Sequence, residues 1–144
     1  LAIIDAYWDQ NGQALCPAAV GISHHIGPGG DVEPCPPIQF AKEHIDDGDD
    51  FRQLLRDSRF LKEFRSCATD ATRGCLLLEN PRHLQAFLRG QQARDSSGRG
   101  SAYEELDKMG PLPGHHLPGK EIPEKSWFYR FAKKHWFFGF GAYG

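Results

Sequence analysis

The sequence predicts an α+β domain, in which a short β-hairpin unit is followed by short helices. The hairpin is indicated by Gly27-Pro28-Gly29-Gly30, a turn-forming run between two strand-like segments. The helices are indicated by apolar residues at helical spacing from Asp50 onward. Four cysteines are spread over the same region, and we expect the short elements to be arranged around a four-cysteine metal site.

Short strands are predicted in the first part of the chain. Residues 1–7 are apolar and partly β-branched, and a second, brief strand leads to Cys16. The hairpin strands then run over residues 20–26 and 31–33. Prolines on both sides of Cys35 cannot donate to a strand ladder, so we expect the backbone to leave the sheet at this cysteine in a rigid, extended form.

Helical patterns begin after a connecting segment, residues 38–50, that has little periodicity and is predicted to be mostly loop. Apolar spacing predicts a helix from Asp50 to near Cys67, interrupted at Asp57-Ser58, so that it forms two short helices or one kinked helix. Residues 68–74, between Cys67 and Cys75, are expected to be a loop. Residues 76–78, directly after Cys75, are expected to form an apolar cluster.

Three further helices are predicted from their capping signals. Asn80 is a suitable N-cap for a helix over residues 81–90, with Pro81 at the first helical position. Ser101 and Glu104 form a capping-box pattern before a helix over residues 102–109. A last helix is predicted to begin after Ser126. Residues 91–100 and 110–123 are rich in glycine, serine or proline, so we predict that both segments are loops.

Length and charge limit the classes of function. The chain has 144 residues, 17 basic and 19 acidic, with no long run of one sign, so nucleic-acid binding is not indicated. No apolar run approaches the ~20 residues of a membrane span. We therefore expect no membrane span and a cytoplasmic location, where cysteines stay reduced or bind metal more often than they form disulfides.

The spacing of the cysteines leaves several interpretations open. Eighteen residues separate Cys16 from Cys35, and seven separate Cys67 from Cys75. No pair forms Cys-x-x-Cys, so a zinc finger or ribbon is poorly supported, although distant thiolates can converge on zinc. Four unrelated buried or free cysteines are the third interpretation.

Other chemistry-bearing residues give weaker signals. His24 and His25 are adjacent on the expected hairpin, so only one of them could face a metal, and a surface or packed position is favoured for both. Asp31 and Glu33 share one face of their strand and are expected to be solvated. The aromatic and basic residues 127–143 fit a helix on a membrane surface or a partner, but packing into the core is favoured.

Two stretches of the chain resemble the C-terminal SPASM or twitch extension of radical SAM enzymes. The first runs from Ala6 to Pro36 and contains Cys16, thirteen residues, Gly30, four residues and Cys35, which is the spacing that opens this extension. The second comprises Ser58-Arg-Phe-Leu61, Phe64-Arg65 and Gly74-Cys75-Leu-Leu-Leu-Glu-Asn-Pro81. The resemblance covers roughly residues 2–88.

This resemblance implies one auxiliary 4Fe-4S cluster held by Cys16, Cys35, Cys67 and Cys75. Cys16 and Cys35 match the opening motif, and the other two are the thiols left to complete the ligands. The single-cluster form is the closer match, because a two-cluster SPASM domain needs further cysteines that this sequence lacks. Four thiolates would leave no iron open to substrate, so electron transfer or substrate positioning is the implied role.

The motif CxxxCxxC, which binds the catalytic cluster and S-adenosylmethionine in this family, is absent from the sequence. The resemblance therefore implies a radical SAM barrel, in cis or in trans, that carries S-adenosylmethionine and a second 4Fe-4S cluster. We expect it in cis, because the chain begins without Met inside an apolar run. The expected organisation is an auxiliary-cluster domain in residues 1–90 and a C-terminal extension in residues 91–144.

The expected function is thus to hold an iron–sulfur cluster near the substrate of a radical SAM enzyme. The alternative is a zinc-stabilised, non-catalytic interaction module that uses the same four thiolates. The sequence specifies neither the substrate nor the reaction type.

Overall fold

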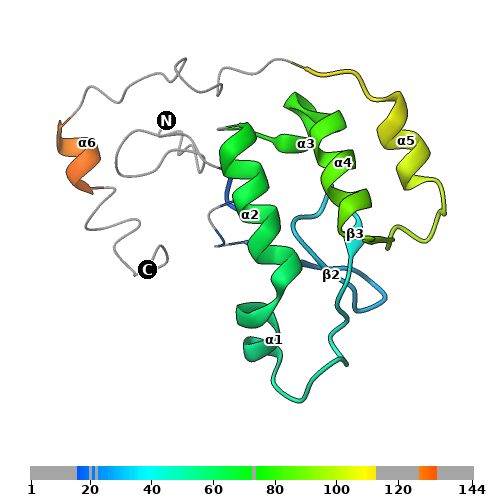
Figure 1. Ribbon diagram of the computed structural model, residues 1–144. Helices are drawn as coiled ribbons and strands as arrows, with labels where there is room; N and C mark the ends of the chain where they lie inside the picture. The colour runs from blue at the N-terminus through cyan, green and yellow to red at the C-terminus, as the bar shows by residue number, and fades with distance from the viewer. Residues whose placement is uncertain (1–15, 20, 22, 73, 113–126, 133–144) are drawn as a thin grey trace.

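The computed structural model describes residues 16–19, 21, 23–72, 74–112 and 127–132. Within them the fold is α+β, as predicted, with two antiparallel pairs of short strands and a set of short helices (Figure 1). The strands are β1 (His25–Ile26), β2 (Val32–Glu33), β3 (Phe40–Ala41) and β4 (Arg94–Asp95). The helices are α1 (Phe51–Asp57), α2 (Arg59–Ala71), α3 (Leu76–Glu79), α4 (Pro81–Gly90), α5 (Ala102–Lys108) and α6 (Trp127–Ala132).

The predicted hairpin is confirmed in a shorter form. His25 pairs with Glu33 and Ile26 with Val32 in an antiparallel ladder. The turn needs glycine at position 30, which has φ +90° and donates its backbone N–H to the carbonyl of Gly27. The first strand begins only at His25, and residues 20 and 22 lie outside the described residues.

A second strand pair, between β3 and β4, lies in segments that were predicted to be loops. Phe40 pairs with Asp95 and Ala41 with Arg94. Two-residue strands carry almost no alternation, so only the tertiary contact between distant segments defines them. The pair joins residues on either side of position 90, and the predicted domain boundary there remains a prediction.

The predicted break between the first two helices is confirmed at Ser58. Its backbone N–H donates to the carbonyl of Leu54, which ends α1, and its hydroxyl accepts from the N–H of Leu61, which begins α2. The prediction that the helix ends near Cys67 was wrong, because α2 continues to Ala71. Residues 76–79, predicted as an apolar cluster only, form the single-turn helix α3.

Helix α4 lies at the centre of the helical layer, in contact with α2, α3 and α5 (Figure 1). Its N-terminus is capped as predicted, since the Asn80 side chain accepts from the N–H of His83. Its Leu84 and Leu88 are fully buried. The core continues from these residues to α2, the strands and α5, through Phe60, Leu61, Phe64, Val32, Phe40, Ala102 and Leu106.

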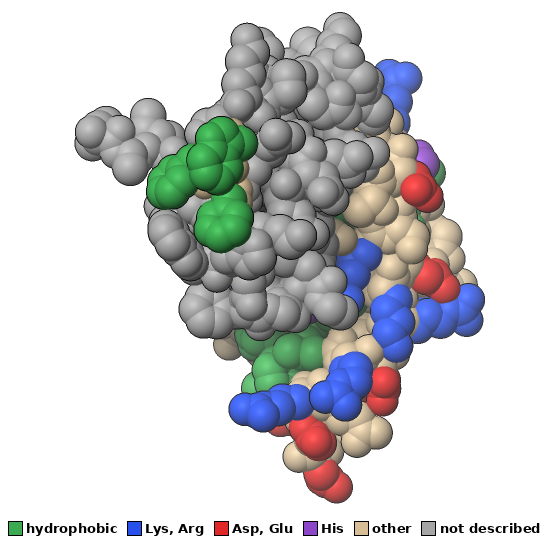
Figure 2. Space-filling model, turned by 90° about the vertical axis from the view of Figure 1, so that its left-hand side faces the viewer, with side chains coloured by type: hydrophobic (Ala, Val, Ile, Leu, Met, Phe, Trp, Pro, Cys, Tyr) green, Lys and Arg blue, Asp and Glu red, His purple; other side chains and the backbone are tan. Residues whose placement is uncertain are grey.

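The last two described helices differ from prediction in their contacts. Helix α5 begins at Ala102 as predicted, but Ser101 makes no capping bond, and the Ala102 N–H donates instead to the Asp95 carboxylate. Core packing of the aromatic helix α6 was also a wrong prediction for its described side chains, because Trp127 is 71% exposed and Phe128 54%. Figure 2, seen from the side of α6, shows hydrophobic side chains gathered at this surface. The strand predicted over residues 1–7 and the second brief strand before Cys16 lie outside the described residues.

Candidate metal centre

The four cysteines come from four different parts of the fold. Cys16 lies at the start of the turn that precedes the hairpin, and Cys35 follows β2. Cys67 is on α2, and Cys75 directly precedes α3. Each is a free thiol, and each is partly buried.

Cys16 and Cys35 begin turns of the same kind. Each is followed by proline, and in the second turn the backbone N–H of Ile38 donates to the carbonyl of Cys35 at 3.0 Å. The backbone N–H groups of Ala19 and Ile38 act to lower the pKa of the Cys16 and Cys35 thiols, against the larger effect of burial, and at Cys16 the N–H of Ala18 acts in the same direction. Such donors stabilise a thiolate and tune the properties of a metal bound to it. The repeated Cys-Pro-x-x pattern is visible in the sequence and is the signal that could have predicted these turns.

Three of the thiols lie close enough to influence one another. Burial is the main cause that raises the pKa of Cys16 and Cys35, to about 12 for Cys35. The charge of Cys75 raises the pKa of both, and that of Cys16 also raises the pKa of Cys35. The fold thus brings together three thiols from segments that are far apart in the sequence.

Cys67 has different neighbours. Burial raises the pKa of its thiol to about 11, and the nearby charge of Asp70, on the same helix, raises it further. None of the other three cysteines contributes to this shift. The structure therefore gives the predicted fourth ligand less support than it gives the other three.

The described side chains form no group that could hold a single metal ion. Nowhere in the described ranges do three or more His, Cys, Asp or Glu side chains meet closely enough to hold one metal ion. With zinc–sulfur bonds of about 2.3 Å, tetrahedral zinc needs its thiolates about 3.8 Å apart. A cubane cluster binds each thiolate to a different iron, so its ligands lie further apart.

The buried carboxylate of Glu33 lies near the thiol of Cys35. Glu33 is 1% exposed, and its charge contributes to the raised pKa of Cys35. The prediction that Glu33 is solvated was wrong, because both of its oxygens are bonded. Nδ1 of His25 lies 2.7 Å from Oε2, and the hydroxyl of Ser96 donates to Oε1 at 2.6 Å. Ser96 lies sixty-three residues further along the chain, so no local pattern in the sequence indicates this network.

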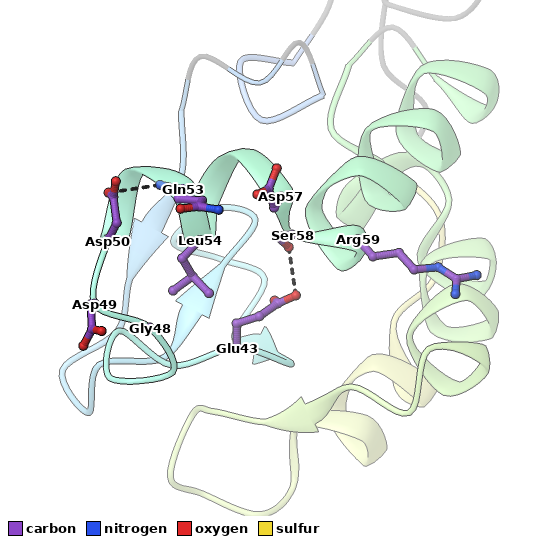
Figure 3. Close-up of a pocket in the computed structure, with 9 residues that line it drawn as sticks. All are labelled: Glu43, Gly48, Asp49, Asp50, Gln53, Leu54, Asp57, Ser58 and Arg59. Atoms are coloured by element: carbon purple, nitrogen blue, oxygen red, sulfur yellow. Dashed lines mark hydrogen bonds between the residues drawn. The ribbon is translucent and has the colours of Figure 1, made fainter.

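A hollow on the described surface lies elsewhere, between residues 43–50 and the junction of α1 and α2 (Figure 3). It has a volume of about 490 Å³ and no cysteine in its lining. Two of its acidic residues serve local structure: Asp50 accepts from the backbone N–H groups of Arg52 and Gln53 in the first turn of α1, and Glu43 accepts from the hydroxyl of Ser58. This hollow is therefore separate from the candidate metal centre.

No described helix has the length and apolar character needed to cross a membrane. Comparison of the chain with protein-family models, curated proteins and solved structures found no match.

Proposed function

We propose that this chain binds an iron–sulfur cluster and acts as the auxiliary-cluster domain of a radical SAM enzyme. The observation that carries the proposal is the approach of Cys16, Cys35 and Cys75, from a turn, a strand end and a helix start. Cys67 is the remaining thiol, and we assign it as the fourth ligand of the proposed cluster. The resemblance of the two cysteine-bearing stretches to the SPASM or twitch extension supports the same assignment.

The surroundings of the sulfurs support thiolate ligation. The backbone N–H groups of Ala19 and Ile38 act to lower the pKa of the two thiols, so they would favour the thiolates of the ligated state. Because burial favours the neutral thiols, cluster binding must release their protons, so it becomes more favourable as pH rises.

A bound 4Fe-4S cluster would supply one-electron chemistry at this edge of the fold. The residues of the chain would then hold the cluster, shield part of it from water and set its position relative to a substrate in the barrel. The barrel itself, in cis or in trans, is part of the proposal, as are S-adenosylmethionine and the second cluster that it would carry.

Zinc is the competing occupant, in a non-catalytic interaction module built on the same thiolates. The thiolates of a cubane cluster lie further apart than those around one zinc ion, and no described group of three such side chains meets closely enough for a single ion, so the cluster is the first proposal. Metal content distinguishes the two occupants directly.

The deciding experiment is iron, sulfide and zinc analysis of the protein purified without oxygen, together with its absorbance near 400 nm. We expect about four irons and four sulfides per chain, with the absorbance of a cluster. Alanine variants of Cys16, Cys35 and Cys75 should each lose the cluster, and Ser66→Ala, an exposed position on the same helix as Cys67, should retain it. Zinc, or no metal at all, would contradict the proposal.

Cys67→Ala tests the fourth ligand separately. Loss of iron equal to that of the other three variants would assign Cys67 to the cluster. Full iron content in this variant would limit the protein ligands to three thiolates and remove Cys67 from the site.

A further inference from the structure

Helix α6 carries aromatic side chains that are exposed at the surface. Trp127 is 71% exposed, Phe128 54% and Phe131 45% (Figure 2). The rings of Trp127 and Phe128 contact each other edge to face, with their centroids 6.1 Å apart. Apolar rings that stay in water forgo the stabilisation that burial would give, and a group of them on one helix marks a surface that binds something apolar.

The sequence from Trp127 to the end of the chain has the composition of a membrane–water interface. Nine of its eighteen residues are aromatic: Trp127, Phe128, Tyr129, Phe131, Trp136, Phe137, Phe138, Phe140 and Tyr143. The segment contains no Leu, Ile, Val or Met. Core helices and membrane spans are rich in these aliphatic residues, whereas Trp and Tyr are enriched where the headgroups of a bilayer meet water.

The formal charge of the same segment is positive. Its charged residues are Arg130, Lys133 and Lys134, and it contains no Asp or Glu. The complete chain has more acidic than basic residues, so this end differs in sign from the rest. Basic residues next to exposed aromatic side chains match the charge of an anionic lipid surface.

A helix-binding groove on another protein fits α6 less well. Such grooves bind side chains that recur at i, i+3 or i+4 and i+7 along an amphipathic helix. Helix α6 has six residues, which is fewer than two turns, so it is too short to present that series. A lipid surface sets no such register, because it is uniform in the plane of the membrane.

We propose that α6, together with the basic residues that follow it in the sequence, binds the surface of an anionic lipid bilayer. The exposed rings of α6 would enter the headgroup region, and the basic side chains would lie near the lipid phosphates. This binding is to the surface of the membrane and involves no span. It does not rest on the proposed function, because residues 127–144 contain no cysteine.

The test is flotation of the full 144-residue chain with lipid vesicles in a density gradient, which separates bound protein from aggregates. One set of vesicles is phosphatidylcholine alone, and the other is equal parts of phosphatidylcholine and phosphatidylglycerol. We expect the wild type to float with the anionic vesicles and much less with the neutral ones. High sodium chloride should reduce the bound fraction, because salt screens the charges.

An aromatic variant tests the apolar contribution. Trp127→Ala combined with Phe131→Ala should weaken the apparent affinity for anionic vesicles about tenfold or more, because two rings are lost from the interface. The matched control combines Phe51→Ala and Leu112→Ala, which remove exposed apolar side chains outside α6. This control should float as the wild type does.

A charge variant tests the preference for anionic lipid. Changing Arg130, Lys133 and Lys134 to Gln should remove most of the difference between the two kinds of vesicle. The matched control changes three exposed arginines on α1 and α4 to Gln and should keep the difference; these are Arg52, Arg56 and Arg82. Where the aromatic variant fails to fold, the charge variant carries the test.

Three results would overturn the proposal. The first is a wild-type chain that stays unbound with anionic vesicles, which would leave the exposed rings of α6 to a protein partner. The second is equal binding to neutral and anionic vesicles. The third is a loss of binding in the control variants as large as that in the matched variants.

Discussion

Ser96→Ala tests whether the buried carboxylate of Glu33 is part of the stabilising framework. The Ser96 hydroxyl donates to Oε1 of Glu33 at 2.6 Å, and Nδ1 of His25 lies 2.7 Å from Oε2 of Glu33. Each carboxylate oxygen therefore has one side-chain partner. Because Glu33 is only 1% exposed, removal of the hydroxyl leaves a charged oxygen without a donor and with little access to water.

The expected cost follows from the kind of bond that is lost. A hydrogen bond to a charged group contributes about 1.5–3 kcal/mol to the free energy of unfolding. For a chain of this size, a loss of that order lowers Tm by about 3–12 °C. Denaturant unfolding followed by circular dichroism measures the free energy, and an unchanged m-value would show that the denatured state is unaffected.

Ser66→Ala is the matched control, because its exposed hydroxyl donates only to the backbone carbonyl of Lys62, at 3.4 Å. We expect a change within about 0.5 kcal/mol for this variant. If Ser96→Ala has an effect as small as that of Ser66→Ala, water reaches Oε1 and the reasoning about a sealed carboxylate fails.

Two further predictions concern the metal-free protein and the hairpin turn. Because burial raises the pKa of Cys35 from 9.0 to about 12, the unfolded state loses the thiol proton first, and stability should fall between these pH values by up to about 1.4 kcal/mol per pH unit for this group. Denaturant unfolding from pH 8 to 11 should show a shallower fall for Cys35→Ala, and equal slopes would contradict the assigned burial. Gly30→Ala should destabilise the protein by about 1–2 kcal/mol or more, because φ is +90° and the new Cβ would lie 2.4 Å from Nε2 of His44, which bonds the carbonyl of Gly29. Gly48→Ala, with open space around its Cβ, is the control in the same assay, and equal stability of the two variants would refute the turn argument.

Local signals in the sequence were sufficient for the elements that local chemistry defines. The glycine-rich turn predicted the hairpin, the pause at Ser58 predicted the helix break, and Asn80 with Pro81 predicted the start of α4. Each signal acts within a few residues, through backbone conformation or a capping bond, so no tertiary contact is needed to interpret it.

Other predictions failed because distant contacts outweighed local ones. Strands β3 and β4 are defined only by their pairing across more than fifty residues. The capping box predicted at Ser101 does not form: the Ser101 hydroxyl donates to the Glu105 carboxylate, and the Asp95 carboxylate accepts from the Ala102 N–H. Glu33 is buried because Ser96 and His25 supply donors for both oxygens.

For the candidate metal centre, the four thiols, their spacing and the prolines after Cys16 and Cys35 can be read from the sequence. The expectation of an extended backbone at Cys35 was wrong, because residues 36–37 form a turn closed by the bond from the Ile38 N–H to the Cys35 carbonyl. Which thiols influence one another depends on the fold, since packing of the hairpin against the helices brings Cys16, Cys35 and Cys75 near one another while Cys67 lies near the charge of Asp70. The pairing of Arg65 with His24 was likewise decided by the fold, because it joins side chains forty-one residues apart. The physical reason is the same in each case: spacing along the chain sets local geometry, whereas burial and charge are properties of what the fold places nearby.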